Sequence, residues 1–150
     1  MLITELGEQL NKLLVNNITF TDNQIRDLIN NYDGDDWKNY IIKNETTYNK
    51  IKVFETDIFD IYIISWNIGQ KSKVHNHPEI GCWLKVLQGS IQEKIYNSKF
   101  ELIKYNTQKI GDISFMKDEI GYHSVHNIEN DLSVSLHVYN PPNFKITSFF

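Results

Sequence analysis

The chain has 150 residues, the length of one ordinary domain, and is long enough to bury a sizeable core. Hydrophobic residues make up 41% and charged residues 23%, a composition typical of soluble globular proteins and not of disordered ones. The formal net charge of −4 argues against a nucleic acid or an anionic membrane surface as the main partner, because both require a basic face.

The first third of the chain has the pattern of helices. Leucines recur on one face of a helix expected over Leu2–Val15. Thr21 and Gln24 have the spacing of a capping box, which starts a second helix with an apolar stripe. Acidic residues precede Trp37–Ile42, and their negative charges would complement the dipole of a third, short helix there. We therefore expect two or three N-terminal helices.

From Ile51 onward the pattern changes to short β-rich segments separated by turn residues. Eight strands of this kind predict a sandwich, a jelly roll or a closed barrel. We expect a single domain over residues 1–150, with a helical part over 1–45 and a barrel over 48–150. The expected strands are Ile51–Glu55, Phe59–Asn67, Cys82–Gln88, Ile91–Tyr96, Phe100–Tyr105, Asp112–Phe115, His123–Asn127 and Leu132–Tyr139.

The sequence gives three indications of where the protein resides. No apolar run approaches the ~20 residues that a membrane span needs. The N-terminus has no basic region followed by an apolar core, so no signal peptide is visible. Cys82, the single cysteine, cannot form an intrachain disulfide, which fits a reducing compartment. We expect a cytoplasmic monomer with no membrane partner.

The histidines form a candidate metal site. On a strand, His75 and His77 would point to the same side and reach one ion, although such a pair alone is equally typical of solvent-facing residues in a hairpin. His123 is the third candidate, and Asn127 follows it by four positions. His126 lies three residues after His123, so on a strand it points to the opposite face, and we interpret it as structural.

This spacing resembles the cupin superfamily. Its two motifs are matched at Gly69, His75, His77 and Gly89, and at His123 and Asn127. Cys82 stands where the first motif usually has glutamate, and Asp118–Gly121 replaces the Pro-x-Gly of the second. The resemblance implies a mainly β fold, a cupin-type β-barrel (jelly roll) with a metal in its mouth.

The absence of the usual glutamate leaves three neutral imidazoles, so the site keeps the full charge of a divalent ion. Such a site suits anionic substrate ligands, a thiolate or a carboxylate, and has open positions as catalytic metals require. Cys82 could itself be a ligand, although a soft thiolate would favour a closed, zinc-like site.

The cysteine and its surroundings resemble the cysteine dioxygenase family, iron enzymes that add both atoms of O2 to a thiol sulfur. The resemblance extends from about Tyr48 to the end of the chain. It is strongest at His75–His77, Gly81–Gly89 and Ser135–Pro142. It implies Fe(2+) held by the three histidines, with a small thiol and O2 as partners.

The tail supplies the other candidate catalytic residues. Ser135, His137 and Tyr139 share one face of a strand. The resemblance implies that they form a hydrogen-bonded triad beside the iron, and that Cys82 can be joined to Tyr139 by a thioether bond, as in animal-type members. A phenol aimed at the metal would donate a hydrogen bond to dioxygen or to a carboxylate.

One position departs from the family. Members that act on cysteine bind the substrate carboxylate with an arginine a few residues after a tyrosine. Tyr48 and Lys50 align there, so a point charge replaces a bidentate fork. The alternative is that Lys50 is an ordinary exposed lysine, in which case Lys52, on the same strand face, is the next candidate.

These features predict a mononuclear non-haem iron thiol dioxygenase that oxidises L-cysteine to cysteine sulfinic acid. One alternative is another small thiol, such as mercaptopropionate or cysteamine. A second is a non-catalytic cupin that binds a metal or a small molecule. Three imidazoles do not identify the metal, because their affinity order favours copper and zinc over iron.

Overall fold

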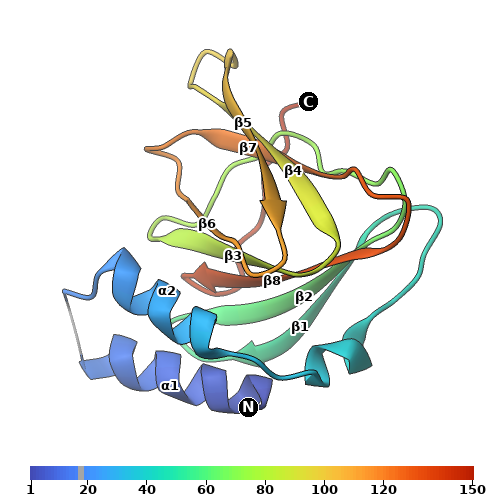
Figure 1. The fold of residues 1–150 in the computed structure, drawn as a ribbon. Helices are drawn as coiled ribbons and strands as arrows, with labels where there is room; N and C mark the ends of the chain where they lie inside the picture. Colours follow the sequence, from blue (N-terminus) through green and yellow to red (C-terminus); the bar gives the residue numbers. More distant parts are fainter. Residues whose placement is uncertain (17–18) are drawn as a thin grey trace.

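The computed structural model describes residues 1–16 and 19–150, in which two helices lie side by side against one of two β-sheets (Figure 1). Helix α1 covers Ile3–Asn16 and α2 covers Asp22–Asn31. The segment predicted as a third helix is η1, a short 3-10 helix over Asp36–Tyr40. None of the described helices has the length and apolar character needed to cross a membrane.

Eight strands follow, close to the predicted segments. All their pairings are antiparallel, and they form a five-stranded sheet in the order β1-β2-β8-β3-β6 and a three-stranded sheet in the order β5-β4-β7. The strands are β1 Asn49–Glu55, β2 Asp60–Trp66, β3 Gly81–Gln88, β4 Ser90–Tyr96, β5 Leu102–Lys109, β6 Ile113–Met116, β7 Tyr122–Asn127 and β8 Ser133–Asn140.

Strand β5 differs most from its prediction, because it starts at Leu102 and not at Phe100. The Asn97 side chain accepts hydrogen bonds from the backbone N–H groups of Lys99 and Glu101 and holds the preceding residues in a turn. Phe100 has a φ of 61°, a left-handed conformation that no extended strand contains. The apolar residue at 100 therefore belongs to the turn.

The helices cover one face of the five-stranded sheet, and the three-stranded sheet lies across the other (Figure 1). Leu6, Leu10, Ile25 and Ile29 of the helices pack with apolar residues of β2 and β8 in one buried cluster. A second cluster, which includes Trp66, Leu84, Ile91 and Val125, fills the space between the two sheets. The cavity described below opens beside this second cluster.

Polar contacts tie α2 to its place. The predicted capping box is present, since Thr21 Oγ1 accepts from the Gln24 N–H at 3.2 Å and Gln24 Oε1 accepts from the Thr21 N–H at 2.8 Å. At the other end, Lys85 Nζ of β3 donates to the carbonyls of Ile29 and Tyr32 at 3.1 and 2.8 Å. Lys85 is only 7% exposed, so if its ammonium group were removed, little water could reach these two carbonyls to donate hydrogen bonds in its place.

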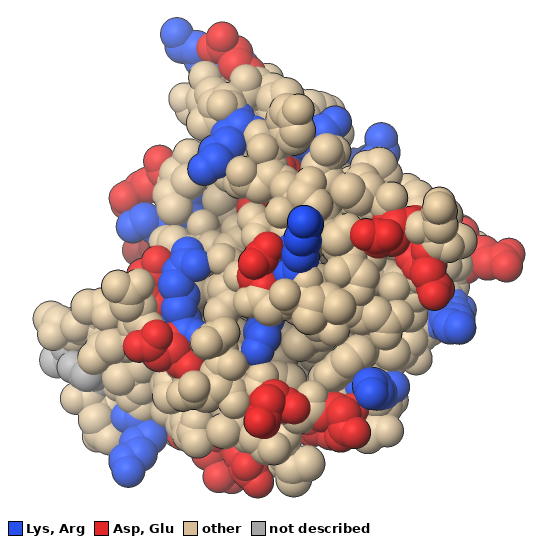
Figure 2. All heavy atoms as spheres, viewed as in Figure 1, with Lys and Arg blue, Asp and Glu red and all other residues tan. Residues whose placement is uncertain are grey.

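The face drawn in Figure 2 carries acidic and basic side chains interspersed over the helices and the sheet edges. Opposite charges at such spacing largely cancel beyond a Debye length of about 8–10 Å. This face therefore presents no extended field of a single sign.

We expect Lys85→Met to lower the free energy of unfolding by about 1–3 kcal/mol, because two buried carbonyls at the end of α2 lose their donor. Urea denaturation followed by circular dichroism measures the change. The control is Lys104→Met on β5, where the lysine is exposed. Equal midpoints for Lys85→Met and the wild type would show that this end of α2 is held by packing alone.

Candidate metal centre

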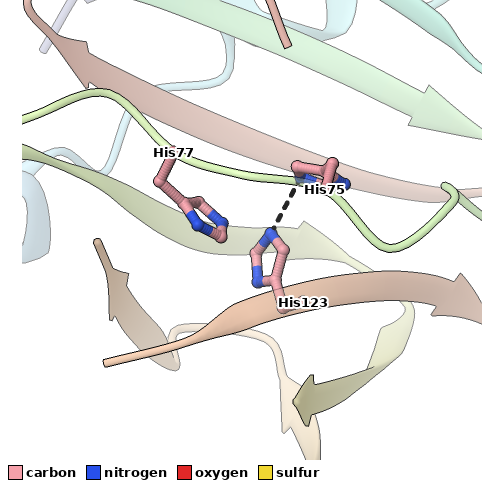
Figure 3. Close-up of side chains that lie close together, drawn as sticks. All are labelled: His75, His77 and His123. Carbon is pink, nitrogen blue, oxygen red and sulfur yellow. Dashed lines mark hydrogen bonds between the residues drawn. The ribbon is translucent and has the colours of Figure 1, made fainter. Parts of the chain in front are cut away.

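The three candidate ligands converge at the mouth of the space between the sheets (Figure 3). His75 and His77 lie in the extended connection between β2 and β3, and His123 lies on β7. This connection lies outside the expected strands and makes isolated bridges at Lys71 and His75, and it still brings His75 and His77 to one point, as their spacing predicts. One bridge pairs His75 with His123, with reciprocal backbone hydrogen bonds of 3.0 and 3.3 Å.

The ligand atoms of these three histidines all lie within 4.8 Å of one another. All three side chains are buried. Burial lowers the pKa of each imidazole, and for His77 the neighbouring His123 and His75 lower it further. The rings are therefore neutral near neutral pH, the form in which imidazole binds a metal.

The partners of the Nδ1 atoms assign the tautomers of two rings. His75 Nδ1 lies 2.7 Å from the carbonyl of Lys73, which can only accept, so this nitrogen carries the proton. His123 Nδ1 lies 2.6 Å from Glu93 Oε2, and we assign it the proton as well. Each Nε2 then carries a lone pair, and the two Nε2 atoms lie 3.1 Å apart. A cation bound to both relieves the repulsion between the lone pairs.

His77 completes the set. Among the described residues neither of its buried ring nitrogens has a hydrogen-bond partner, although Nδ1 lies 3.5 Å from Asp118 Oδ1. Such burial is costly unless an ion or another ligand satisfies these atoms. Asp118 holds its backbone, accepting from the His77 N–H at 2.8 Å. Asp118 comes from the segment that stands in place of the Pro-x-Gly of the second cupin motif. This segment therefore helps to position His77. The residues fit a metal ion with three imidazole ligands.

The predicted catalytic residues form the wall beside the three histidines. Cys82 of β3 and Tyr139 of β8 are paired directly across the two strands. Ser135 Oγ lies 2.8 Å from His137 Nε2 and accepts from Trp66 Nε1 at 2.9 Å. Burial raises the pKa of the Cys82 thiol and of the Tyr139 phenol.

The expected triad is present only in its first link. His137 Nδ1 faces Cys82 Sγ at 3.9 Å, so both of its ring nitrogens are directed at groups other than Tyr139. The rings of His137 and Tyr139 are neighbours with centroids 6.0 Å apart, and no hydrogen bond joins them among the described residues. The contacts therefore run Trp66, Ser135, His137, Cys82.

A cavity adjoins the three histidines. Tyr48 lines it and packs on Trp66 with ring centroids 4.5 Å apart. Ser135 lies behind His137, outside the lining. The lining residues are Tyr48, Lys50, Ile64, Trp66, Ser72, His75, Asn76, His77, Pro78, Cys82, His123, Val125, His137, Tyr139, Phe144 and Ile146.

Lys50 is the lysine that reaches the cavity. Its Nζ lies 4.4 Å from the ring centroid of Tyr62 and 4.2 Å from that of Tyr139, within cation–π range. Burial lowers its pKa, an effect that the nearby Asp60 carboxylate opposes. Lys52 is exposed and pairs with Glu55 and Asp60 at 3.3 and 3.6 Å, outside the cavity lining.

Two other predicted residues lie outside the cavity. Asn127 is buried, and its side-chain Nδ2 donates to the carbonyls of Trp66, Asn67 and Asp131, so it braces the loops around β7. His126 points away from the three histidines into a surface groove.

Sequence reasoning missed the C-terminal segment and Glu93. Phe144 and Ile146 line the cavity, and the segment after them pairs with the connection that carries His75. The Phe149 N–H donates to the Val74 carbonyl at 2.8 Å. Neither residue belongs to a periodic segment. The sequence did contain a signal for Glu93. It lies two residues from Ile91 and two from Ile95 on β4, both buried, so its side chain is predicted to point inward with theirs.

Comparisons with known proteins agree with this geometry. A family model described as "Cysteine dioxygenase type I" matches residues 3–150. Cysteine dioxygenase type 1 of Rattus norvegicus is 34% identical over 91 residues, which are 56% of this chain and 46% of the rat protein. The Homo sapiens protein of the same name is 28% identical over 129 residues, 79% of this chain and 64% of that protein. The matched regions thus span about half to two thirds of these relatives.

Solved structures support the fold. A double-stranded β-helix protein from Klebsiella pneumoniae superposes with a TM-score of 0.64 at 20% identity, over 76% of this chain and 94% of that one. A cupin superfamily protein from Desulfitobacterium hafniense gives a TM-score of 0.56 at 12% identity, over 68% and 84%. The predicted cupin-type fold, mainly β with N-terminal helices, is confirmed.

We expect His75→Ala, His77→Ala and His123→Ala each to lose most of the bound metal, because each removes one of three protein ligands. The matched control is His126→Ala, which removes a histidine of the same strand as His123 but outside the site. Metal analysis of the purified proteins measures the result. Normal metal content in His123→Ala would contradict the site.

Proposed function

The chain belongs to the cysteine dioxygenase type I family, and from this premise we propose that it is a mononuclear non-haem iron enzyme acting on L-cysteine. The product would be cysteine sulfinic acid. The reaction balances without a further reductant, since a thiol and O2 together contain every atom of the sulfinic acid. The observation that carries the proposal is the convergence of three buried imidazoles beside a cavity with a lysine cation.

The iron would be held by His75, His77 and His123. When bound, it supplies the redox chemistry and brings the thiolate and O2 together. Three neutral ligands suit a substrate that brings its own anionic groups. The zinc-like alternative, in which Cys82 is a fourth ligand, is less well supported because Cys82 Sγ faces His137 and burial keeps the thiol protonated.

Lys50 would bind the substrate carboxylate. The faces of Tyr62 and Tyr139 hold its Nζ within the cavity, so little side-chain entropy remains to be lost on binding. Tyr48 would form the adjoining wall through its packing on Trp66. A cation in this place favours thiols with a carboxylate, cysteine or mercaptopropionate, over cysteamine.

Tyr139 would donate a hydrogen bond to the reacting groups. Its raised pKa keeps the phenol protonated at neutral pH. His137 and Ser135 would hold the wall in position through the contacts from Trp66 to Cys82. Cross-strand neighbours have Cβ atoms about 4.5–5.5 Å apart, which supports a Cys82–Tyr139 thioether. Its formation would remove one S–H and one ring C–H bond, with O2 as the oxidant.

Aerobic incubation of the iron-loaded protein with cysteine, mercaptopropionate and cysteamine tests the function, with O2 uptake and sulfinate mass as readouts. We expect cysteine sulfinate to form with one O2 consumed per thiol. Tyr139→Phe should keep its iron and turn over much more slowly. O2 uptake that is equal with and without iron, or no sulfinate from any of the three thiols, would leave a non-catalytic cupin as the better description.

We expect Lys50→Arg to lower the KM for cysteine about 10-fold and Lys50→Ala to raise it. The guanidinium makes two charge-assisted hydrogen bonds to a carboxylate where lysine usually makes one, and each contributes about 1.5–3 kcal/mol. Cysteamine has no carboxylate, so its KM should stay constant. Lys52→Ala, outside the cavity, is the control. Unchanged KM values in both Lys50 variants would place the carboxylate elsewhere.

A further inference from the structure

Glu93 is a buried acid in direct contact with a candidate ligand. It lies on β4 and is 1% exposed. Its Oε2 is 2.6 Å from His123 Nδ1, and its Oε1 accepts a hydrogen bond from Ser114 Oγ at 2.8 Å. Both carboxylate oxygens are thus used, one of them on the ring that faces the other two histidines.

The position of Glu93 joins the two sheets at the metal centre. Glu93 and His123 belong to the three-stranded sheet, where Ile95, two residues on from Glu93, is paired with His123. Ser114 belongs to β6 at the edge of the five-stranded sheet. A buried carboxylate costs several kcal/mol unless its oxygens are satisfied. An apolar residue at this position would avoid the cost of burying a charge. The presence of a carboxylate therefore indicates a role other than stabilising the fold.

We propose that Glu93 is a positioning residue of the metal centre, and this rests on the proposed three-histidine metal site. The carboxylate accepts a hydrogen bond from His123 Nδ1–H, which fixes the tautomer and the plane of the ring and turns the Nε2 lone pair towards His75 and His77. Carboxylate partners of this kind also make the imidazole a better ligand.

Glu93 also changes the charge of the site. Cys82 occupies the position where cupins usually carry a glutamate ligand. Glu93 supplies one negative charge behind His123 instead of in contact with the ion. A divalent ion with three neutral imidazoles would carry +2, and an ionised Glu93, whose pKa burial raises and the hydrogen bond from Ser114 lowers, would reduce the local charge to +1. The coordination positions on the cavity side remain free for the substrate.

Two variants separate orientation from charge. Glu93→Gln keeps the volume and an oxygen that accepts from His123 Nδ1, while its amide can donate to Ser114, but the charge is lost. Glu93→Ala loses both. The matched control is Glu129→Gln, since Glu129 likewise accepts a serine hydroxyl, from Ser90, but is exposed and makes no contact with the three histidines.

The readouts are the affinity of the metal-free proteins for Co(II), by competition with a chromogenic chelator, and the visible absorption of bound Co(II). We expect a 10- to 100-fold loss of affinity for Glu93→Ala and a smaller loss for Glu93→Gln. The Co(II) bands should shift in both variants and not in Glu129→Gln. Melting temperatures of the metal-free proteins report on folding, and if Glu93→Ala does not fold, Glu93→Gln decides.

Wild-type affinity and unshifted bands in Glu93→Gln and Glu93→Ala, with lowered melting temperatures, would overturn the proposal and leave Glu93 as a structural bridge between sheets. Failure of the wild type to bind Co(II) would overturn it together with the metal site. A wild type that binds Co(II) but, loaded with iron, oxidises no thiol would overturn the proposed function alone. The order of affinities would still decide the part played by Glu93.

Discussion

Strand β8 lies between β2 and β3, and its register fixes both the core and the site. Val134, Leu136 and Val138 join the core beneath the helices, while His137 and Tyr139 line the cavity on the opposite face. A slip of one residue would exchange these faces and place an imidazole and a phenol against the helices. Apolar packing on one side of β8 therefore holds the side that lines the cavity in register, and the helices influence the site without touching it.

The interior of the barrel combines neutral rings with a few fixed charges. The pKa values of the three candidate ligands and of His137 are lowered by burial, so the imidazoles act as neutral dipoles and lone pairs. Glu93 lies behind His123, and Lys50 lies against the tyrosine rings of the cavity wall, so the two side chains bring opposite charges to different parts of the site. In a medium of low dielectric constant such charges orient an ion and an anionic substrate strongly.

Local patterns were sufficient for the elements. Hydrophobic periodicity and turn residues predicted both helices and all eight strands, whereas the set of three candidate ligands depended on the resemblance to the motifs of a family, because His-x-His spacing alone is equally typical of solvent-facing residues. Contacts between remote segments were not predictable in this way. The approach of Glu93 to His123, the turn of His137 towards Cys82 and the covering of the cavity by Phe144 depend on pairings that only the folded sheets create. The exact conformation around His75 depends likewise on its bridge to Ser148.

The bridge between His75 and Ser148 cannot form during translation until Ser148 has been synthesised. His75 and His77 are synthesised about half-way along the sequence, whereas His123 and the segment at Ser148 that pairs with His75 come much later. A nascent chain that has reached only the first two histidines offers an ion two ligands in a mobile segment, which is a weak site. The full set of three exists once the late strands have docked. If the three histidines hold an ion, the folded cavity and not the emerging polypeptide would select it, because only the folded state presents all three ligands together.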